Sequence, residues 1–317
     1  MRGSCFASVA VVLIAGVLVG GEKAGGKTKP LTLHTRRQVR VEKSQPAKFA
    51  AVEQTVQWDP KQTAIIVCDM WDDHWCKGAA ARVVELAGPL NRLVAEARRQ
   101  GVFVIHAPST TVDFYEGTPQ RKRAQEAPYA KPPVELSTKT RWGTCWCWPD
   151  EARESELPID DSDMGCDCRE KCEISAPWRR QIAAIEIDEA DAISDNGQEV
   201  YNLLAARGIK HVIMTGVHLN MCVLGRPFAI RQLTYLGFDV VLVRDMTDTM
   251  YNSQKRPFVD HFTGTDLMIE HVEKYWRPTI ASVDLVGGQP FRFKEDKRLL
   301  VQSARPHGKD RPEPTAE

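Results

Sequence analysis

Strand-length runs of mostly apolar residues recur along the chain and are separated by segments with helical periodicity. The expected strands are Thr63–Asp69, Val102–His106, Ala183–Ile187, His211–Thr215, Asp239–Arg244 and Thr279–Leu285. The expected helices are Ala79–Gln100, Asn196–Ala206, Asn220–Leu236 and Asp266–Tyr275. Strands that are apolar on both faces are typical of a parallel sheet with helices on both sides. Six strands are too few for an eightfold barrel, so the pattern predicts a three-layer αβα fold with a parallel six-stranded sheet.

Two of the expected helices contain a proline. Pro89 follows Gly88 and predicts a kink or a break there, and Pro227 predicts a local distortion in the later helix.

The N-terminus has the pattern of a secretory signal peptide at residues 1–21. Arg2 precedes an apolar run, Cys5–Gly20, which is shorter than a membrane span, and small residues follow it. An uncleaved anchor is the alternative interpretation. We expect export to the periplasm or the extracellular space, with no membrane attachment after cleavage. Residues 22–57 are expected to be a linker and an N-terminal arm, 58–290 the catalytic domain, and 291–317 a charged tail.

The charge balance restricts the partners of the protein. The 317 residues include 42 basic and 42 acidic side chains, without a long basic run, which argues against nucleic acid as a partner. We expect a small-molecule substrate and no cofactor, and the chain either stays monomeric or forms a homo-oligomer.

Residues 107–180 lack periodicity and form an expected insertion rich in cysteine and tryptophan. Loops of this length are usually functional or disordered. Export favours disulfides over zinc, and the C-x-C and C-x-C-x3-C spacings match no familiar zinc pattern. We therefore expect most of six cysteines to be paired and Cys68 and Cys222 to stay free. The six are Cys76, Cys145, Cys147, Cys166, Cys168 and Cys172. Three tryptophans, Trp142, Trp146 and Trp148, either wall a substrate pocket or form the core of this insertion.

Ligands of open parallel sheets bind beyond the carboxyl ends of the strands. Cys222 follows such an end, in the first turn of an expected helix, where the helix dipole favours a thiolate. A buried, inert cysteine is the equally weighted alternative. Asp69 ends the first apolar run, and a carboxylate there costs desolvation unless it has a partner or a task.

These two segments resemble the isochorismatase-like cysteine hydrolases, the superfamily that includes the nicotinamidases. Thr63–Asp73 (TAIIVCDMWDD) resembles their first strand, and Thr215–Leu224 (TGVHLNMCVL) resembles their nucleophile turn. The resemblance covers about 60–285 and implies the three-layer fold. It also implies Cys222 as nucleophile, Asp69 as its catalytic acid–base partner, and a cis peptide bond at Val217–His218. The backbone N–H groups of His218 and Cys222 would hold the oxyanion.

The sequence departs from this family in two places. The catalytic lysine of the family has no counterpart in 187–191, where Asp188 and Glu189 stand instead. Four cations could replace it: Lys139, Arg141, Arg226 or Arg244. We favour the alternative, in which the carboxylates hold a cationic ligand and nicotinamide is a poor substrate. The metal motif that follows the second strand is also absent, so we expect no metal.

The leading hypothesis is an exported hydrolase that cleaves a small amide or related C–N bond by acyl transfer. Trp71, His106, Asp188 and His218 are the candidate residues of the substrate pocket. The His218 side chain has a suitable ordinary pKa for acid–base chemistry, or else points away from the site. The alternatives are a family member that binds without turnover, and a cysteine-independent hydrolase that uses Asp69 as general acid.

Overall fold

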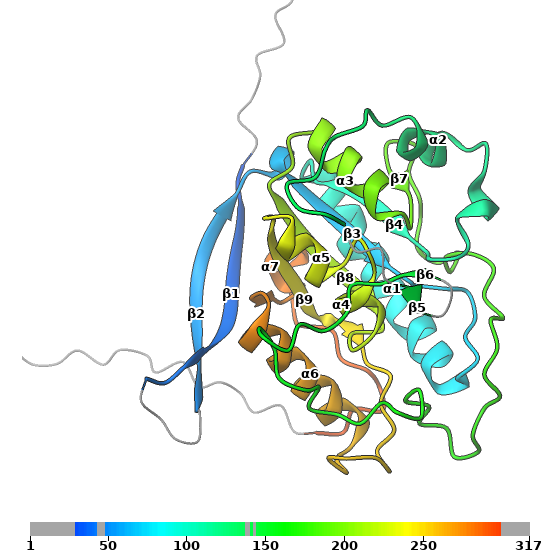
Figure 1. Ribbon diagram of the computed structural model, residues 1–317, viewed down its shortest axis with the longest axis vertical. Coiled ribbons are helices and arrows are strands. Elements are labelled where there is room, and N and C mark those ends of the chain that lie inside the picture. Colours follow the sequence, from blue (N-terminus) through cyan, green and yellow to red (C-terminus); the bar gives the residue numbers. More distant parts are fainter. Residues whose placement is uncertain (1–28, 43–47, 137–139, 142–143, 299–317) are drawn as a thin grey trace, which may run out of the picture.

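The computed structural model describes residues 29–42, 48–136, 140–141 and 144–298 (Figure 1). The strands of its main sheet are β1 (Leu31–Arg40), β2 (Phe49–Trp58), β3 (Thr63–Cys68), β4 (Phe103–Ala107), β7 (Ala192–Ile193), β8 (His211–Val217), β9 (Asp239–Asp248) and β10 (Thr279–Ile280). A separate two-stranded sheet joins β5 (Thr140–Arg141) and β6 (Thr144–Cys145). The expected signal peptide and most of the charged tail lie outside the described residues.

The helices are α1 (Lys77–Arg99), α2 (Pro119–Gln125), α3 (Gly197–Ala206), α4 (Cys222–Gly225), α5 (Ile230–Tyr235), α6 (His261–Tyr275) and α7 (Val283–Val286). Two short 3-10 helices, η1 (Pro60–Gln62) and η2 (Val112–Tyr115), precede β3 and α2. Within the described part of the chain, no helix combines the length and the hydrophobicity needed to cross a bilayer.

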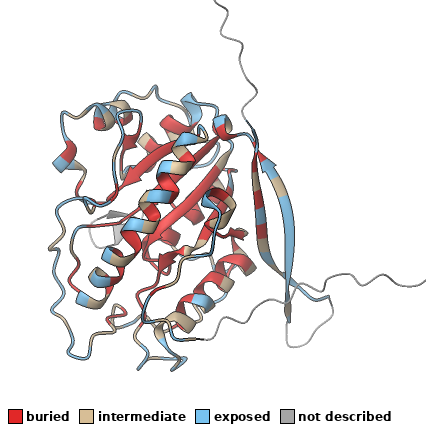
Figure 2. Cartoon of the chain, turned by 180° about the vertical axis from the view of Figure 1, so that it is seen from behind, coloured by how far each residue is buried: buried red, intermediate tan, exposed pale blue. Residues whose placement is uncertain are grey.

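The main sheet has eight strands in the order β2-β1-β10-β9-β8-β3-β4-β7. The six strands from β10 to β7 are parallel, as predicted. The expected six-stranded sheet is incomplete, however, because the N-terminal arm adds β1 and β2. These form a long antiparallel hairpin, and β1 joins β10 through the pair Arg36 and Thr279. The hairpin is only partly buried: Leu31 and Leu33 of β1 lie in the core, whereas most of β2 is exposed (Figure 2).

Helices cover both faces of the sheet and make three layers. On one face, apolar residues of α1 such as Leu86 and Leu90 pack against Ile65 and Val67 of β3. On the other face, α3, α5 and α6 contribute to a second core cluster around Ile66 of β3. Neighbouring residues of β3 therefore point to opposite cores, which explains why the strand is apolar throughout.

The structure corrects the expected third strand, Ala183–Ile187. The strand that pairs with β4 is β7, five residues later, and Ala183 and Ala184 are exposed. Two side chains of α1 bind the backbone of Glu186: Asn91 accepts its N–H at 3.0 Å and Arg98 donates to its carbonyl at 3.5 Å. These contacts replace the hydrogen bonds that a neighbouring strand would make.

Three other expected elements differ from the observed ones in their continuity or their ends. The helix α1 runs through Gly88 and Pro89 without a break. The helix expected at Asn220–Leu236 is divided around Pro227 into α4 and α5, as the proline predicts. The last expected strand ends at Ile280, because the Ser282 N–H and hydroxyl both bind the Asp245 carboxylate and turn the chain into α7.

Candidate functional site

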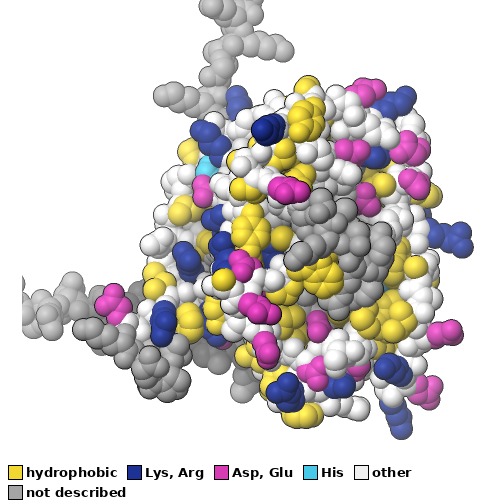
Figure 3. Space-filling view, in the orientation of Figure 1, with side chains coloured by type: hydrophobic (Ala, Val, Ile, Leu, Met, Phe, Trp, Pro, Cys, Tyr) yellow, Lys and Arg dark blue, Asp and Glu magenta, His cyan; other side chains and the backbone are white. Residues whose placement is uncertain are grey.

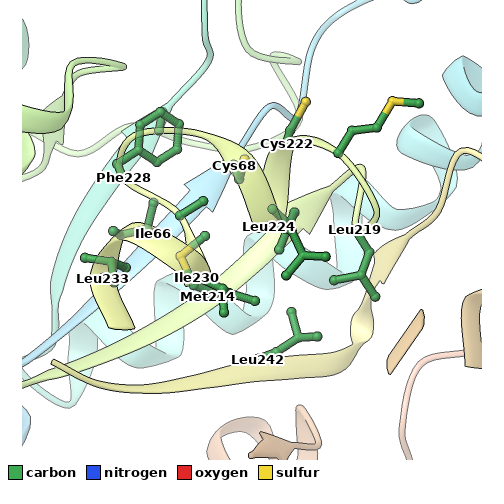
Figure 4. Packing of buried hydrophobic residues seen from close by; sticks show 14 of the residues in the cluster. Ile66, Cys68, Met214, Leu219, Cys222, Leu224, Phe228, Ile230, Leu233 and Leu242 are labelled. Atoms are coloured by element: carbon green, nitrogen blue, oxygen red, sulfur yellow. The ribbon is translucent and has the colours of Figure 1, made fainter. Parts of the chain in front are cut away.

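The nucleophile candidate lies where β8 ends and α4 begins. Cys222 is the first residue of α4 and is 5% exposed. Figure 4 shows its sulfur directed away from the buried side chains of Leu224 and Ile230, while Cys68 lies below it. The peptide bond between Val217 and His218 is cis, as the family resemblance implies. The thiol is therefore held at the beginning of a short helix, just after the turn that follows the buried strand β8.

Asp69 follows the neighbouring strand, β3, and faces the same site. Its side chain is fully buried. The Oδ1 atom accepts the Ser109 N–H at 2.7 Å, and Oδ2 accepts the Arg226 Nε–H at 3.1 Å. The Cys222 thiol lies beside the same carboxylate, whose charge acts on its pKa. Two donors therefore orient the Asp69 carboxylate next to the thiol.

The pKa of Cys222 is shifted upward, to about 12. Burial is the largest cause, and the negative charge of Asp69 adds to it, while the Arg226 charge and the His218 N–H oppose it. At neutral pH the resting group is therefore a thiol beside Asp69. The helix dipole does not make it a resting thiolate, as its position in the sequence suggested.

Arg226 places a positive charge beside Asp69 at this site. It is buried, follows α4 directly, and its guanidinium also lies 5.5 Å from the ring centre of Trp146. The Trp146 ring packs on α4, since a Cβ built on Gly225 would lie 2.4 Å from it. Of the two candidate cations whose side chains the structure describes, Arg226 and Arg244, Arg226 contacts Asp69. The side chains of Lys139 and Arg141 are not described, and Arg244 lines a separate hollow beside Arg36.

A cavity of about 380 Å³ opens over Cys222 and is mainly apolar and aromatic. Its lining residues are Trp71, His74, Trp75, Thr110, Met164, Ile174, Ser175, Ala176, Trp178, His218, Met221, Cys222, Arg226 and Met250. The Trp71 and Trp178 rings stack with centres 4.5 Å apart. Residues 164–178 come from the expected insertion, which therefore forms one wall of the cavity.

Two imidazoles face each other in the cavity wall. The rings of His74 and His218 are 4.7 Å apart, and burial lowers the pKa of His74 to about 4. Burial, with the neighbouring His74, also holds the pKa of His218 well below its ordinary value. Both rings are therefore neutral at pH 7. Among the described residues, the His218 Nε2 atom is buried without a hydrogen-bond partner.

Two of the four pocket candidates lie elsewhere. His106 is fully buried in β4, where its ring contacts Gln181 and Asp191 at 3.0 Å each. Asp188 is exposed, and its carboxylate caps the Ala190 N–H. Neither is among the residues that line the cavity, whereas Trp71 and His218 are. The hypothesis that Asp188 and Glu189 hold a cationic ligand at the site is wrong: neither lines the cavity, because the strand that reaches this edge is β7 and both residues precede it.

After β7, the strand that lies next to β4, the carboxylate that reaches this edge of the sheet is Asp195, two residues beyond the strand. It accepts the Thr110 N–H at 2.7 Å, and burial together with the Asp69 charge raises its pKa. The sequence contains little signal for Asp195, because a strand of two residues has no detectable periodicity. The residues Trp178 and Met164 were missed because the insertion lacks a periodic pattern.

The disulfides expected in the insertion are not formed among the described cysteines. Cys76, Cys166, Cys168 and Cys172 are free, as are Cys68 and Cys222. The side chain of Cys145 lies outside the described residues.

Acidic and basic side chains are interspersed on the face shown in Figure 3, in keeping with the balanced charge of the chain.

No protein-family model and no curated protein matches the chain. Similar solved structures include a cysteine hydrolase from Pseudomonas syringae pv. phaseolicola 1448A, with 15% identity over 72% of this chain and 92% of that chain and a TM-score of 0.42. An isochorismatase family protein from Desulfovibrio vulgaris has 16% identity over 71% and 96%, with a TM-score of 0.40. N-carbamoylsarcosine amidase from Thermoplasma acidophilum has 13% identity over 70% and 96%, with a TM-score of 0.34. A functional assignment therefore depends on the side chains at the cavity.

Proposed function

We propose that this protein is an isochorismatase-like cysteine hydrolase that cleaves a small amide or related C–N bond by acyl transfer. One observation carries the proposal: the Cys222 thiol lines a cavity and lies beside the buried Asp69 carboxylate, which acts on its pKa. A thiol paired with a base, with the base oriented by further donors, is the arrangement of covalent catalysis. Here Ser109 and Arg226 orient the base.

In the proposed reaction, Asp69 accepts the thiol proton as the Cys222 sulfur attacks the substrate carbonyl carbon. The carbonyl π electrons move to oxygen, and the N–H groups of His218 and Cys222 stabilise that oxyanion. Collapse breaks the C–N bond, and Asp69 returns the proton to the leaving nitrogen. Water, deprotonated by Asp69, then hydrolyses the thioester and regenerates the thiol.

The cavity favours an uncharged, flat substrate. Its walls carry tryptophans and two neutral imidazoles, and Arg226 is the cation that lines it. A cationic ligand, which the sequence favoured, would meet that positive charge without Asp188 or Glu189 nearby. The polar groups available for orientation are Thr110, Ser175 and the imidazole of His218.

The test is a panel of small uncharged amides, carbamoyl compounds and nicotinamide, with intact-mass detection of an acyl adduct. We expect turnover of at least one compound, an adduct on Cys222, and loss of both in Cys222→Ala. Cys147→Ala is the matched control, because Cys147 is another buried cysteine that does not line the cavity. Turnover that survives Cys222→Ala would contradict the proposal and support the cysteine-independent mechanism with Asp69 as general acid.

A binding protein without turnover is the second candidate, favoured by the raised pKa of Cys222. It predicts saturable binding of panel compounds with neither an adduct nor product.

Separately, we propose export by the apolar run Cys5–Gly20. N-terminal sequencing of the protein from a secreting host would then begin close to Glu22, whereas a chain that retains the run would contradict export.

A further inference from the structure

Four cysteines from two distant segments meet at the beginning of α1. Cys76 is the residue that caps the helix, and Cys166, Cys168 and Cys172 come from the insertion. The sulfur atoms of Cys76, Cys166 and Cys168 all lie within 4.8 Å of one another. The Cys172 thiol interacts with those of Cys166 and Cys168. We call these four residues the four-cysteine cluster.

The spacing of the sulfurs distinguishes a metal site from a disulfide. Cys76 and Cys168 have their Sγ atoms 3.8 Å apart. A disulfide needs a separation of about 2.05 Å. Thiolates bound tetrahedrally at about 2.3 Å from zinc lie about 3.8 Å from one another. The observed separation is therefore that of neighbouring ligands around one tetrahedral ion.

Backbone N–H groups converge on the same sulfurs. The first turn of α1 directs two of them outward: Lys77 donates to Cys172, and Gly78 donates to Cys168 at 3.2 Å. The N–H groups of Cys168 and Cys172 both donate to Cys166. Donors of this kind orient thiolate ligands and offset their negative charge, and the positive end of the helix dipole adds to the effect.

We propose that the four-cysteine cluster binds one Zn²⁺ ion as a tetrathiolate structural site. Soft thiolate ligands in a tetrahedral set select zinc among the common divalent ions, and four protein ligands leave no open position for chemistry. Asp167 lies between two of the ligands in sequence. Its Oδ2 atom is 2.7 Å from Arg82 Nη1, and its Oδ1 atom accepts from Cys76 Sγ at 3.7 Å. Because the ion pair with Arg82 holds this carboxylate, we assign the four sulfurs as the ligand set.

The site would tie together two walls of the cavity. Trp71, His74 and Trp75 lie within five residues before Cys76, and the lining residues Ile174 to Trp178 begin two residues after Cys172. The insertion has little regular structure of its own, so its position depends on such tertiary ties. An ion that cross-links both segments would fix the cavity shape, and its binding free energy would add to the stability of the fold.

The first experiment measures metal in the purified full chain, without added metal, by elemental mass spectrometry. We expect one zinc ion per chain. Each of C76S, C166S, C168S and C172S should lower the zinc content by about tenfold or more. C147S is the matched control, since Cys147 belongs to the same insertion but not to the cluster, and it should keep the zinc. Iron in place of zinc, or equal losses in C147S and C172S, would overturn the assignment.

A second measurement does not require the variants to fold. Zinc is removed from the unaltered chain with a chelator under reducing conditions, and Co²⁺ is added. A tetrathiolate site gives the strong visible and thiolate charge-transfer absorption of tetrahedral cobalt. Peptide mapping before reduction is the opposing arm. A Cys76–Cys168 disulfide with no bound metal, or cobalt spectra of an octahedral ion, would refute the zinc site whether or not the chain is a hydrolase.

Discussion

The Nε atom of Arg226 lies 3.1 Å from Oδ2 of Asp69, and both side chains are buried beside the Cys222 thiol. No lysine stands at 187–191, and Arg226, which follows α4 at the same edge of the sheet, contacts the carboxylate instead. Arg226 orients the proposed base and also opposes the rise in the thiol pKa, to which the Asp69 charge contributes.

Substitution of Arg226 tests this relationship. Arg226→Met removes the partner of a buried carboxylate, so we expect a loss of about 3–5 kcal/mol in the free energy of unfolding. Arg226→Lys keeps the charge but not the Nε–H geometry, so we expect a folded protein with kcat/KM reduced about a hundredfold. Denaturant unfolding and steady-state kinetics measure the two effects. Arg92→Met, an exposed change in α1, is the control. A fully stable and active Arg226→Met protein would contradict the role of the pair.

Asp69→Asn separates thiol reactivity from catalysis. Because the Asp69 charge contributes to the raised pKa of Cys222, its removal should lower that pKa and increase the thiolate fraction at pH 8. Each unit of decrease raises that fraction about tenfold. We therefore expect faster alkylation of Cys222 by iodoacetamide, measured by peptide mapping, together with loss of hydrolysis. Slower alkylation in the Asn variant would mean that Asp69 does not hold the thiol in its protonated form.

The parallel core and both strand-end residues of the site could be predicted from the sequence. Asp69 and Cys222 each follow a long, fully buried strand, and such strands have a strong apolar signal. Asp195 follows β7, whose two residues have no such signal, so the prediction placed the site edge at Asp188 instead. The position of Arg226 beside Asp69 depends on tertiary packing against Trp146, which no local pattern encodes.

Position 216, in β8, requires glycine for two reasons: its backbone conformation and the close approach of a neighbouring strand. Its φ is +104°, and an added Cβ would lie 2.0 Å from the carbonyl oxygen of Cys68. Gly237 has a similar φ of +86°, with nothing near its Cβ position among the described atoms. Gly237→Ala should therefore cost about 1 kcal/mol, the ordinary cost of a left-handed backbone.

Gly216→Ala should cost several times as much and should displace the β3 end that carries Asp69. Denaturant unfolding compares the two variants. Equal losses would mean that the contact with Cys68 relaxes easily.

Glu154, in the insertion, accepts hydrogen bonds from three buried groups. Arg231 Nε and the ring nitrogens of His271 and Trp276 each lie 2.8 Å from its carboxylate. Although burial acts to raise the pKa of Glu154, these donors hold it at about 2, below the ordinary 4.5. A depressed pKa in the folded state contributes stability above the unfolded pKa and loses it as pH falls through the folded pKa. The window therefore runs from about pH 5 to about pH 2, and a shift of this size corresponds to at most about 3 kcal/mol.

Glu154→Gln should accordingly be less stable than the unaltered protein at pH 7, and the difference should shrink as the pH approaches 3. Urea unfolding at pH 7, 5, 4 and 3 gives the two curves. The exposed neighbour Glu151→Gln is the matched control and should follow the unaltered protein throughout. If the Glu154→Gln curve stays parallel to that of the unaltered protein, the carboxylate is not held ionised by its three donors. Convergence at low pH, with the control unchanged, is the result that ionised Glu154 requires.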